Sequence, residues 1–143
     1  MMQRTRGFTL VELLVAMVIA AILMAIAVPS YRSYVQRTQR TEARQALTQA
    51  RAAQERYFLQ YNRYAADVAA VPPGGLGLPG ITANGLYALQ VTLTPTGYSL
   101  RATPVPGGAQ QDDTRCAAFT VDESGRRTAT RDTGEDNTEE CWR

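Results

Sequence analysis

The residue types that carry most enzyme chemistry are missing from this chain or lack a partner. The 143 residues include no histidine and no lysine, so all fifteen cationic side chains are arginines. Histidine is the usual general base and a common metal ligand, and it activates serine and cysteine nucleophiles. The composition therefore argues against an enzyme, and we expect no catalytic residue, metal or cofactor. A net charge of +2 also lacks the basic excess typical of a dedicated nucleic-acid-binding protein.

One carboxylate stands out because it interrupts an apolar run. Residues 8–28 read FTLVELLVAMVIAAILMAIAV, and Glu12 is the only charged residue among them. A helix of this length spans about 31 Å at ~1.5 Å per residue, which is enough to cross the hydrocarbon core of a bilayer. An ionisable side chain in such a segment is costly and usually functional. The sequence thus predicts a membrane-inserted helix followed by a polar body.

Two kinds of N-terminal signal fit a basic head followed by an apolar run. Arg4 and Arg6 precede the run and place the N-terminus in the cytoplasm, and the AIA tripeptide at residues 25–27 matches a secretory cleavage pattern. The run is, however, longer than a typical signal core and contains Glu12. These features favour a retained membrane segment over a cleaved signal peptide.

The string GFTLVE at residues 7–12, followed by the apolar run, resembles the class III signal of type IV prepilins and related pseudopilins. The resemblance implies that the prepilin peptidase cuts between Gly7 and Phe8 and then methylates the new amine of Phe8. Residues 1–7 would be a leader peptide. Residues 8–28 would be kept as a transmembrane helix that later enters the core of a filament.

The resemblance and the physics both give Glu12 a role in assembly. After cleavage it would be the fifth residue, where the helix dipole favours a carboxylate by about 0.3–1 kcal/mol at exposed sites. The low dielectric of lipid strengthens its attraction to an N-terminal amine. One such amine belongs to the same chain and another to the neighbouring subunit, and the resemblance implies that the second matters during assembly.

We expect the helix to run from Phe8 to about Arg63. Pro29 lacks an N–H and clashes with the preceding turn, which predicts a kink there rather than an end. The stretch from residue 40 to residue 60 has no glycine or proline and is rich in good helix formers. Apolar-leaning residues recur along one face at three- and four-residue spacing: Tyr31, Val35, Thr38, Ala43, Leu47, Ala50, Gln54, Tyr57, Tyr61 and Tyr64.

Four arginines line another face of this helix at spacings of three, four and seven: Arg37, Arg40, Arg44 and Arg51. The favoured interpretation is a solvated surface that Glu42 and Glu55 partly pair, since residues four apart on a helix are neighbours. A subunit interface and a DNA-contacting stripe remain as alternatives.

The rest of the chain predicts an antiparallel sheet. Residues 67–84 include VPPGGLGLPG, which makes a connecting loop. Alternating apolar residues and turn sequences then predict four strands: residues 86–94, 98–102, 116–121 and 126–130. The apolar face of this meander should pack on the second half of the helix. The predicted fold class is α+β and pilin-like, with a long kinked N-terminal helix, transmembrane in its first half, and a periplasmic or extracellular head formed by residues 29–143.

Cys116 and Cys141 are the only cysteines, and we expect them to form a disulfide rather than remain two free thiols. The head is exported, and oxidising compartments favour pairing. The bond would contribute roughly 3–4 kcal/mol in the chain-entropy model and would pin a tail with almost no apolar residues. The resemblance agrees, because pilins carry a C-terminal loop bounded by a disulfide. Trp142 is interpreted as a packing cap beside the bond.

Carboxylates cluster within the loop that the cysteines bound: Asp132, Glu135, Asp136, Glu139 and Glu140. No EF-hand spacing is present, so a solvated acidic loop is favoured over a calcium site.

Four further stretches resemble the PilE-type minor pilins of Gram-negative bacteria: RTEA at 40–43, QERYF at 54–58, the expected hairpin over 86–104, and the ending CWR. The resemblance implies a low-abundance subunit that primes type IV pili or is incorporated into them, and that supports pilus biogenesis, twitching motility, adhesion or DNA uptake. The alternatives are a type II secretion pseudopilin, a major pilin and a DNA-binding competence pilin. Near-neutral charge disfavours the last, since phosphate contacts dominate affinity for DNA.

The same resemblance implies the partners and the location. The partners are major and minor pilin subunits in a helical filament, the prepilin peptidase, the inner-membrane assembly platform and, before assembly, membrane lipid. The chain would first be a single-pass inner-membrane prepilin with a cytoplasmic N-terminus, and then part of an extracellular filament.

Overall fold

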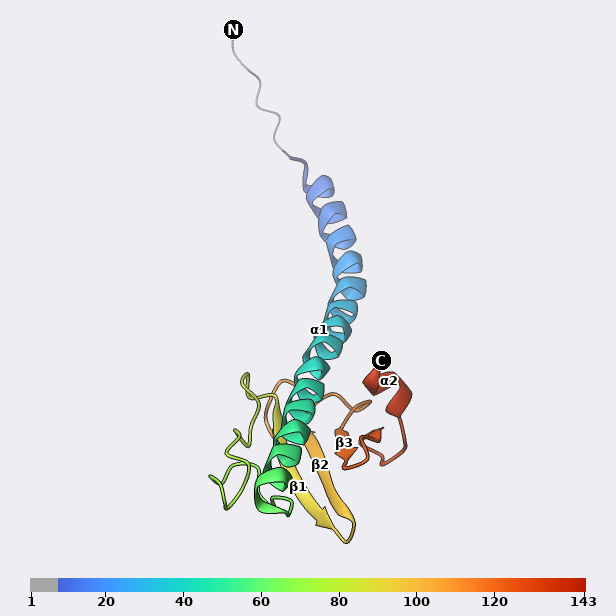
Figure 1. Cartoon of the computed structure of the whole chain (residues 1–143). Coiled ribbons are helices and arrows are strands. Elements are labelled where there is room, and N and C mark those ends of the chain that lie inside the picture. The colour runs from blue at the N-terminus through green and yellow to red at the C-terminus, as the bar shows by residue number, and fades with distance from the viewer. Residues whose placement is uncertain (1–7) are drawn as a thin grey trace. The chain divides into compact units, whose positions relative to one another are not determined.

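The computed structural model describes residues 8–143, which form one long helix, a four-stranded sheet and a short C-terminal helix (Figure 1). The chain divides into two compact units, one ending at residue 35 and one covering residues 36–143. We describe each unit separately. The predicted α+β fold class is confirmed.

Helix α1 covers Leu10–Tyr61, within two residues of the predicted bounds at each end. At its start the backbone N–H of Glu12 donates to Oγ1 of Thr9 at 3.3 Å, so that the threonine caps the first turn. The helix continues through Pro29. It ends where Asn62 adopts a left-handed conformation, with φ of 51°, which few residues other than glycine and asparagine adopt readily.

In the first unit, the helix has no core of its own. Every large apolar side chain from Leu10 to Val28 is at least 48% exposed. This segment is the one helical stretch of the described residues that is long and apolar enough to cross a membrane.

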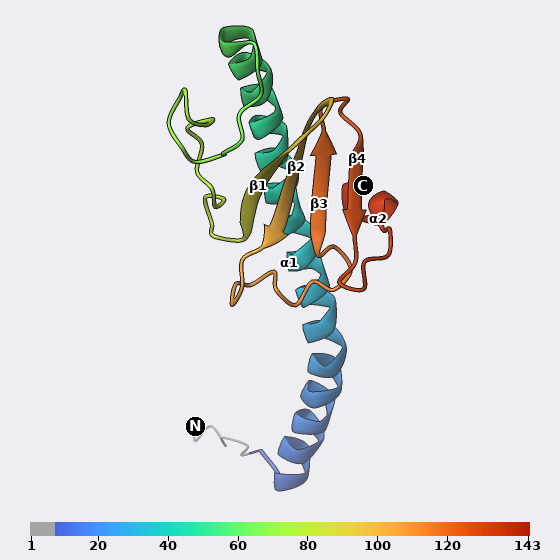
Figure 2. The ribbon, with the colours of Figure 1, turned by 90° about the horizontal axis from the view of Figure 1, so that it is seen from below.

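In the second unit, four antiparallel strands lie in sequence order against the end of α1 (Figure 2). The strands are β1 (Tyr87–Thr94), β2 (Gly97–Pro104), β3 (Ala118–Asp122) and β4 (Arg127–Thr130). Each predicted strand is present, with its ends at most two residues from the predicted ones. A short helix, α2 (Thr138–Trp142), follows β4 and was not predicted.

The core of this unit lies between the sheet and one face of α1. The helix contributes Ala43, Leu47 and Ala50, each fully buried, and these belong to the face that the sequence spacing predicted. The sheet contributes mostly aromatic and β-branched or aliphatic residues: Tyr87, Tyr98, Leu100, Ala102, Phe119, Val121 and Ala129. The alanines at positions 43 and 50 of the helix allow a close approach of the two layers, and the large side chains of the sheet fill the space between them.

Two polar side chains of α1 hold the long connection that leads to β1. The buried amide of Gln54 accepts from the N–H of Ala65 at 2.9 Å and donates to the carbonyl of the same residue at 2.8 Å. Near the other end of the connection, Glu42 accepts two hydrogen bonds from Asn84, at 3.1 and 2.6 Å. The connection is therefore fixed to the helix at both ends despite its many glycines and prolines.

Candidate functional site

The residues that the sequence assigned to processing and assembly lie at the start of α1. Phe8 is 83% exposed, and Glu12 lies in the first turn of the helix. Gly7 lies outside the described residues. The capping hydrogen bond from Glu12 to Thr9 places the carboxylate beside the beginning of the helix, where free backbone N–H groups and the helix dipole favour a negative charge.

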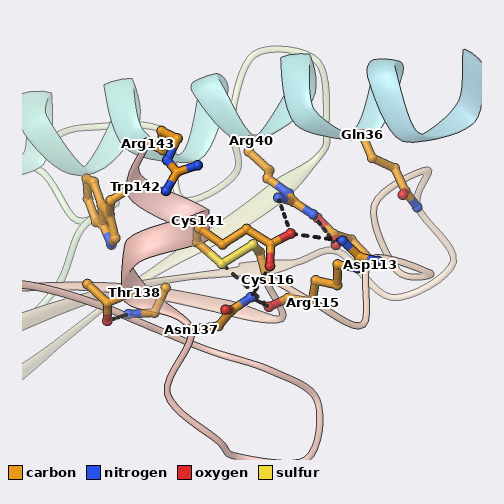
Figure 3. Close-up of a disulfide and its surroundings, with 12 residues drawn as sticks. Gln36, Arg40, Asp113, Arg115, Cys116, Asn137, Thr138, Cys141, Trp142 and Arg143 are labelled. Atoms are coloured by element: carbon orange, nitrogen blue, oxygen red, sulfur yellow. Dashed lines mark hydrogen bonds and ion pairs between the residues drawn. A yellow bond between two sulfur atoms is a disulfide. The ribbon is translucent and has the colours of Figure 1, made fainter. Parts of the chain in front are cut away.

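The disulfide between Cys116 and Cys141 is confirmed and joins the segment before β3 to α2 (Figure 3). The two Cα atoms are 5.8 Å apart, and both cysteines are buried. The bond therefore attaches the polar tail to the sheet, as the sequence predicted. It explains how a helix as short as α2 is held in place.

A buried ion pair between Arg40 and Asp113 is the strongest polar contact between α1 and the rest of the second unit (Figure 3). The guanidinium donates two hydrogen bonds to the carboxylate, Nε at 2.7 Å and Nη2 at 2.9 Å. The two side chains are 6% and 1% exposed. A bidentate geometry of this kind is the strongest form of such a pair.

This pair corrects the prediction that Arg40 belongs to a solvated stripe. Arg40 lies three residues before Ala43 and seven before Leu47, so it continues the buried face of α1. That spacing was the signal that could have identified it. The partner Asp113 lies in the loop between β2 and β3, 73 residues away, and no local pattern singles it out.

Two further arginines of the stripe, Arg44 and Arg51, also contact the body of the second unit. Arg44 donates to the carbonyl of Arg143 and, at 3.0 Å, to the hydroxyl of Thr41. The guanidinium of Arg51 lies against Gly125, where a Cβ would come within 2.8 Å of it. Three of the four arginines of the stripe therefore lie at the contact between α1 and the C-terminal part of the chain.

The two glutamates expected to pair with the stripe have other partners. Glu42 accepts from Asn84, as described above, and Glu55 accepts from the hydroxyl of Tyr98 at 3.2 Å. Burial and the nearby Glu55 carboxylate both raise the pKa of Tyr98, so this hydroxyl stays protonated and donates.

Glu140 of α2 extends the Arg40–Asp113 pair toward the tail. It accepts from Asn137 at 3.0 Å and from Arg115 at 3.1 Å, and one of its oxygens lies 4.0 Å from Arg40. The hydrogen bond from Asn137 and the contact with Arg115 lower the pKa of Glu140. The carboxylate is therefore ionised at neutral pH and ties α2 to the α1 side of the body.

Trp142 packs as the sequence predicted. Its ring meets Phe119 edge to face at a centroid distance of 5.9 Å, and its indole N–H donates to the carbonyl of Thr128 at 3.0 Å. The guanidinium carbon of Arg127 lies 5.2 Å from the centre of the Trp142 ring. Within residues 8–143, no group of three or more acidic, histidine or cysteine side chains converges on a possible metal site.

Two family models match this chain. One, described as the type IV minor pilin ComP, DNA uptake sequence receptor, matches residues 29–120. The other, described as the prokaryotic N-terminal methylation motif, matches residues 2–28. Together they cover the apolar segment and most of the second unit.

Known proteins that resemble this chain are also pilins or fimbrial proteins. The fimbrial protein EcpC of Eikenella corrodens is 33% identical over 114 residues, which is 76% of this chain and 71% of that protein. The type IV major pilin protein PilE1 of Neisseria gonorrhoeae is 32% identical over 62% of this chain and 39% of its own length. Prepilin peptidase-dependent protein D of Escherichia coli (strain K12) is 35% identical over 59% of this chain and 50% of its own length. The chain thus spans half or less of the last two relatives.

A solved type IV pilin from Shewanella oneidensis is 25% identical, with a TM-score of 0.44, over 64% of this chain and 89% of that chain.

A helix with an exposed apolar first half, an N-terminal methylation motif that includes this half, and a disulfide-closed α+β body define a pilin-type fibre subunit. The chain belongs to the type IV pilin family, and its residues 29–120 match the minor pilin ComP model within that family. This is a family of structural proteins, and the chain is a membrane-anchored pilin of the kind that forms pili.

Proposed function

We propose that this chain is a minor pilin that primes a type IV pilus or is incorporated into it. It would be made as an inner-membrane prepilin with a cytoplasmic N-terminus, cut by the prepilin peptidase between Gly7 and Phe8, and methylated on Phe8. The assembly platform of the inner membrane would then move the chain from lipid into a helical filament with other pilin subunits. Pilus biogenesis and the processes that depend on it, such as twitching motility, adhesion or DNA uptake, would follow.

The observation that carries this proposal is the exposure of the apolar half of α1. All large apolar side chains of this run are about half exposed or more. Covering each Leu, Ile or Val would lower the free energy by about 1.5–3 kcal/mol, so the run strongly favours a nonpolar surrounding over water. Lipid or identical helices must cover these side chains. The match of residues 2–28 to the methylation motif, which includes this run, supports retention of the segment after processing.

Within this proposal, residues 8–28 span the membrane and residues 29–143 form the exported head. Pro29 marks the boundary and supplies a bend, since it removes one backbone hydrogen bond of the helix there. The disulfide supports an oxidising location for the head, because such bonds persist outside the cytoplasm.

Glu12 is the residue that we propose for recognition of the incoming subunit. Its carboxylate lies in the first turn, which Thr9 caps, and a methylated amine on a neighbouring Phe8 would be its natural partner in a nonpolar surrounding. The neighbour's helix then packs beside it in a contact that repeats without closing, which generates a filament.

Substitution of Glu12 tests the proposal. Glu12→Ala should leave cleavage intact, because Glu12 lies four residues beyond Phe8 and does not flank the cut, yet reduce the amount of this chain in sheared filaments about tenfold. Glu12→Gln is the matched control for shape, and it should fail to the same degree if charge is what matters. Both variants and the wild-type chain are quantified in filaments and in inner membranes by mass spectrometry. Normal incorporation of Glu12→Ala would contradict the proposal.

A second candidate function is DNA reception, which the description of the matched family model favours. Of the arginine stripe, only Arg37 is exposed, and Arg40 is neutralised by Asp113, so phosphate contacts beyond one at Arg37 must come mainly from arginines outside the stripe. Binding of duplex DNA to the full chain in detergent micelles would be measured against salt. Each phosphate contact contributes a slope of about −0.9 in log affinity against log salt. A slope near zero would exclude this candidate.

A further inference from the structure

A hollow of about 540 Å³ lies beside α1, where β4 and α2 approach the helix. One wall is formed by residues of α1, the other by Arg127 and by Trp142, whose ring Figure 3 shows next to α1. We call this surface the arginine hollow and define it by all of its lining residues: Arg44, Gln45, Thr48, Gln49, Ala52, Arg127 and Trp142.

The arginine hollow carries positive charge that its own lining does not balance. Arg44 and Arg127 are its only charged residues. The Nε atom of Arg44 is buried and has no hydrogen-bond partner among the described residues. The guanidinium of Arg127 is exposed in the hollow, so a carboxylate brought there would gain a charge-assisted hydrogen bond from Arg127 and would neutralise part of the positive charge.

The same chain presents a segment with matching chemistry. Residues 131–136 form a tight loop after β4, which we call the acidic finger. The N–H of Arg131 donates to the carbonyl of Glu135 at 2.8 Å, and Gly134, at φ of 86°, donates to the carbonyl of Arg131 at 3.1 Å. Asp132, Glu135 and Asp136 are exposed and form no ion pair within residues 8–143.

The finger is already ordered for binding. A bridge between Thr130 and Asp136 closes its base, and the backbone hydrogen bonds fix its tip. An ordered loop loses little conformational freedom when it binds, which leaves more of the interaction energy for affinity. Complementary charge then determines which surface it meets and in what register.

We propose that the arginine hollow of one subunit receives the acidic finger of a second copy of this chain. The inference rests on the proposed function, because two copies can adjoin only where subunits are assembled. Hollow and finger are different surfaces, so the contact is heterologous and can be repeated from one copy to the next. Copies of this chain would therefore lie next to each other, instead of being dispersed singly among other pilins.

Photo-crosslinking of the full chain in cells that assemble pili tests this contact. A photoreactive phenylalanine analogue replaces Gln49, an exposed and uncharged residue of the hollow. After irradiation, the band that contains two chains is excised, so that links within one chain are left out. We expect this band to consist of two copies of this chain, linked from position 49 to residues 132–136. A matched probe at Ser124, outside the hollow, should not give this link.

Charge reversal adds a second readout. Arg127→Glu and Glu135→Arg should each lower the yield of the two-copy band about tenfold, since they place like charges together. The chain that carries both changes should recover it, because the charges are again opposite. Arg101→Glu, on the exposed face of β2, should have no effect. Recovery in the double variant separates a lost contact from a damaged fold.

The possible failures are distinguishable. A band that joins position 49 to a different pilin, or the absence of a two-copy band although this chain is present in filaments, would overturn the inference and leave the proposed function standing. Equal yields in the single charge reversals and the wild-type chain would also overturn it. Absence of the wild-type chain from filaments would instead overturn the proposed function itself.

Discussion

The two regions of this pilin solve the problem of apolar surface in opposite ways. From Leu10 to Val28 the large apolar side chains are all exposed, and this segment buries nothing within its own chain. From residue 36 onward a core, a disulfide and a buried ion pair hold helix, sheet and tail together. The first region depends on lipid or other subunits, whereas the second is stabilised by contacts within the chain.

This difference suggests a division of labour. An apolar helix that is stable only against lipid or against identical helices can pass from a membrane into a filament, since both environments cover its apolar side chains. A body that keeps its own core can leave the membrane without unfolding. Substitutions should therefore affect the stability of the second region only where they touch its internal contacts.

The single tryptophan makes the comparison measurable. Trp142 is the only tryptophan of the chain and packs against Phe119 in the second region. Its fluorescence during urea unfolding of the full chain in detergent micelles therefore reports on the body and not on the apolar half of α1. The first three predictions below use this signal.

The largest effect is expected at the buried ion pair. Asp113→Ala leaves the guanidinium of Arg40 buried without its main partner and should lower the free energy of unfolding by about 3–5 kcal/mol. The double variant Arg40→Met, Asp113→Leu removes both charges and should recover most of this loss. A loss below about 1 kcal/mol in Asp113→Ala would show that water already reaches the pair.

Matched leucines in the two regions give the next effect. Leu47 is fully buried, and Leu47→Ala should lower the free energy of unfolding of the body by about 3 kcal/mol, through lost transfer energy and a cavity. Leu14 is 53% exposed, and Leu14→Ala should leave the same unfolding curve unchanged. Equal effects of the two substitutions would contradict the separation of the regions.

Two buried tyrosines should respond differently to loss of the hydroxyl, with free energies of unfolding that differ by about 1 kcal/mol. The hydroxyl of Tyr87 is buried without a hydrogen-bond partner among the described residues, so Tyr87→Phe should be neutral or stabilising. The hydroxyl of Tyr98 donates to Glu55, so Tyr98→Phe should be destabilising. The urea midpoints of the two variants and the wild-type chain measure both effects. A clear destabilisation by Tyr87→Phe would show that the Tyr87 hydroxyl has a hydrogen-bond partner, such as bound water.

The smallest effect concerns pH. Asn137 and Arg115 lower the pKa of Glu140 in the folded chain, so its contribution is complete above the ordinary carboxyl value of 4.5 and is lost as the pH falls through the lowered one. Glu140→Gln should remove this part of the acid sensitivity, by less than about 1 kcal/mol because the site is partly solvated. Identical pH profiles of unfolding for the variant and the wild-type chain would contradict the assignment.

The sequence predicted what local patterns control. The spacing of Ala43, Leu47 and Ala50 identified the buried face of α1, and alternation in residues 86–104 identified the first hairpin. The two cysteines identified their own pairing. The motif around Phe8 and Glu12 is read from adjacent residues, and its roles in processing and assembly stay predictions.

The parts that were missed depend on contacts between residues far apart in the chain. From the local sequence, Arg40 is interpreted as a surface residue, because its partner Asp113 lies in a loop 73 residues further along the chain. Helix α2 is five polar-rich residues long and is held by the disulfide and by Trp142, which propensity does not reveal. Tertiary packing overrides local preference at such positions.

The intact mass of this chain in filaments sheared from cells tests the central claim most directly. If the apolar half of α1 is kept and packs among subunits, the mass should correspond to residues 8–143 with one methyl group and with the disulfide closed. Detection only of the uncut chain, or of a head that lacks residues 8–28, would contradict the account, since the exposed apolar surface would then play no part in assembly.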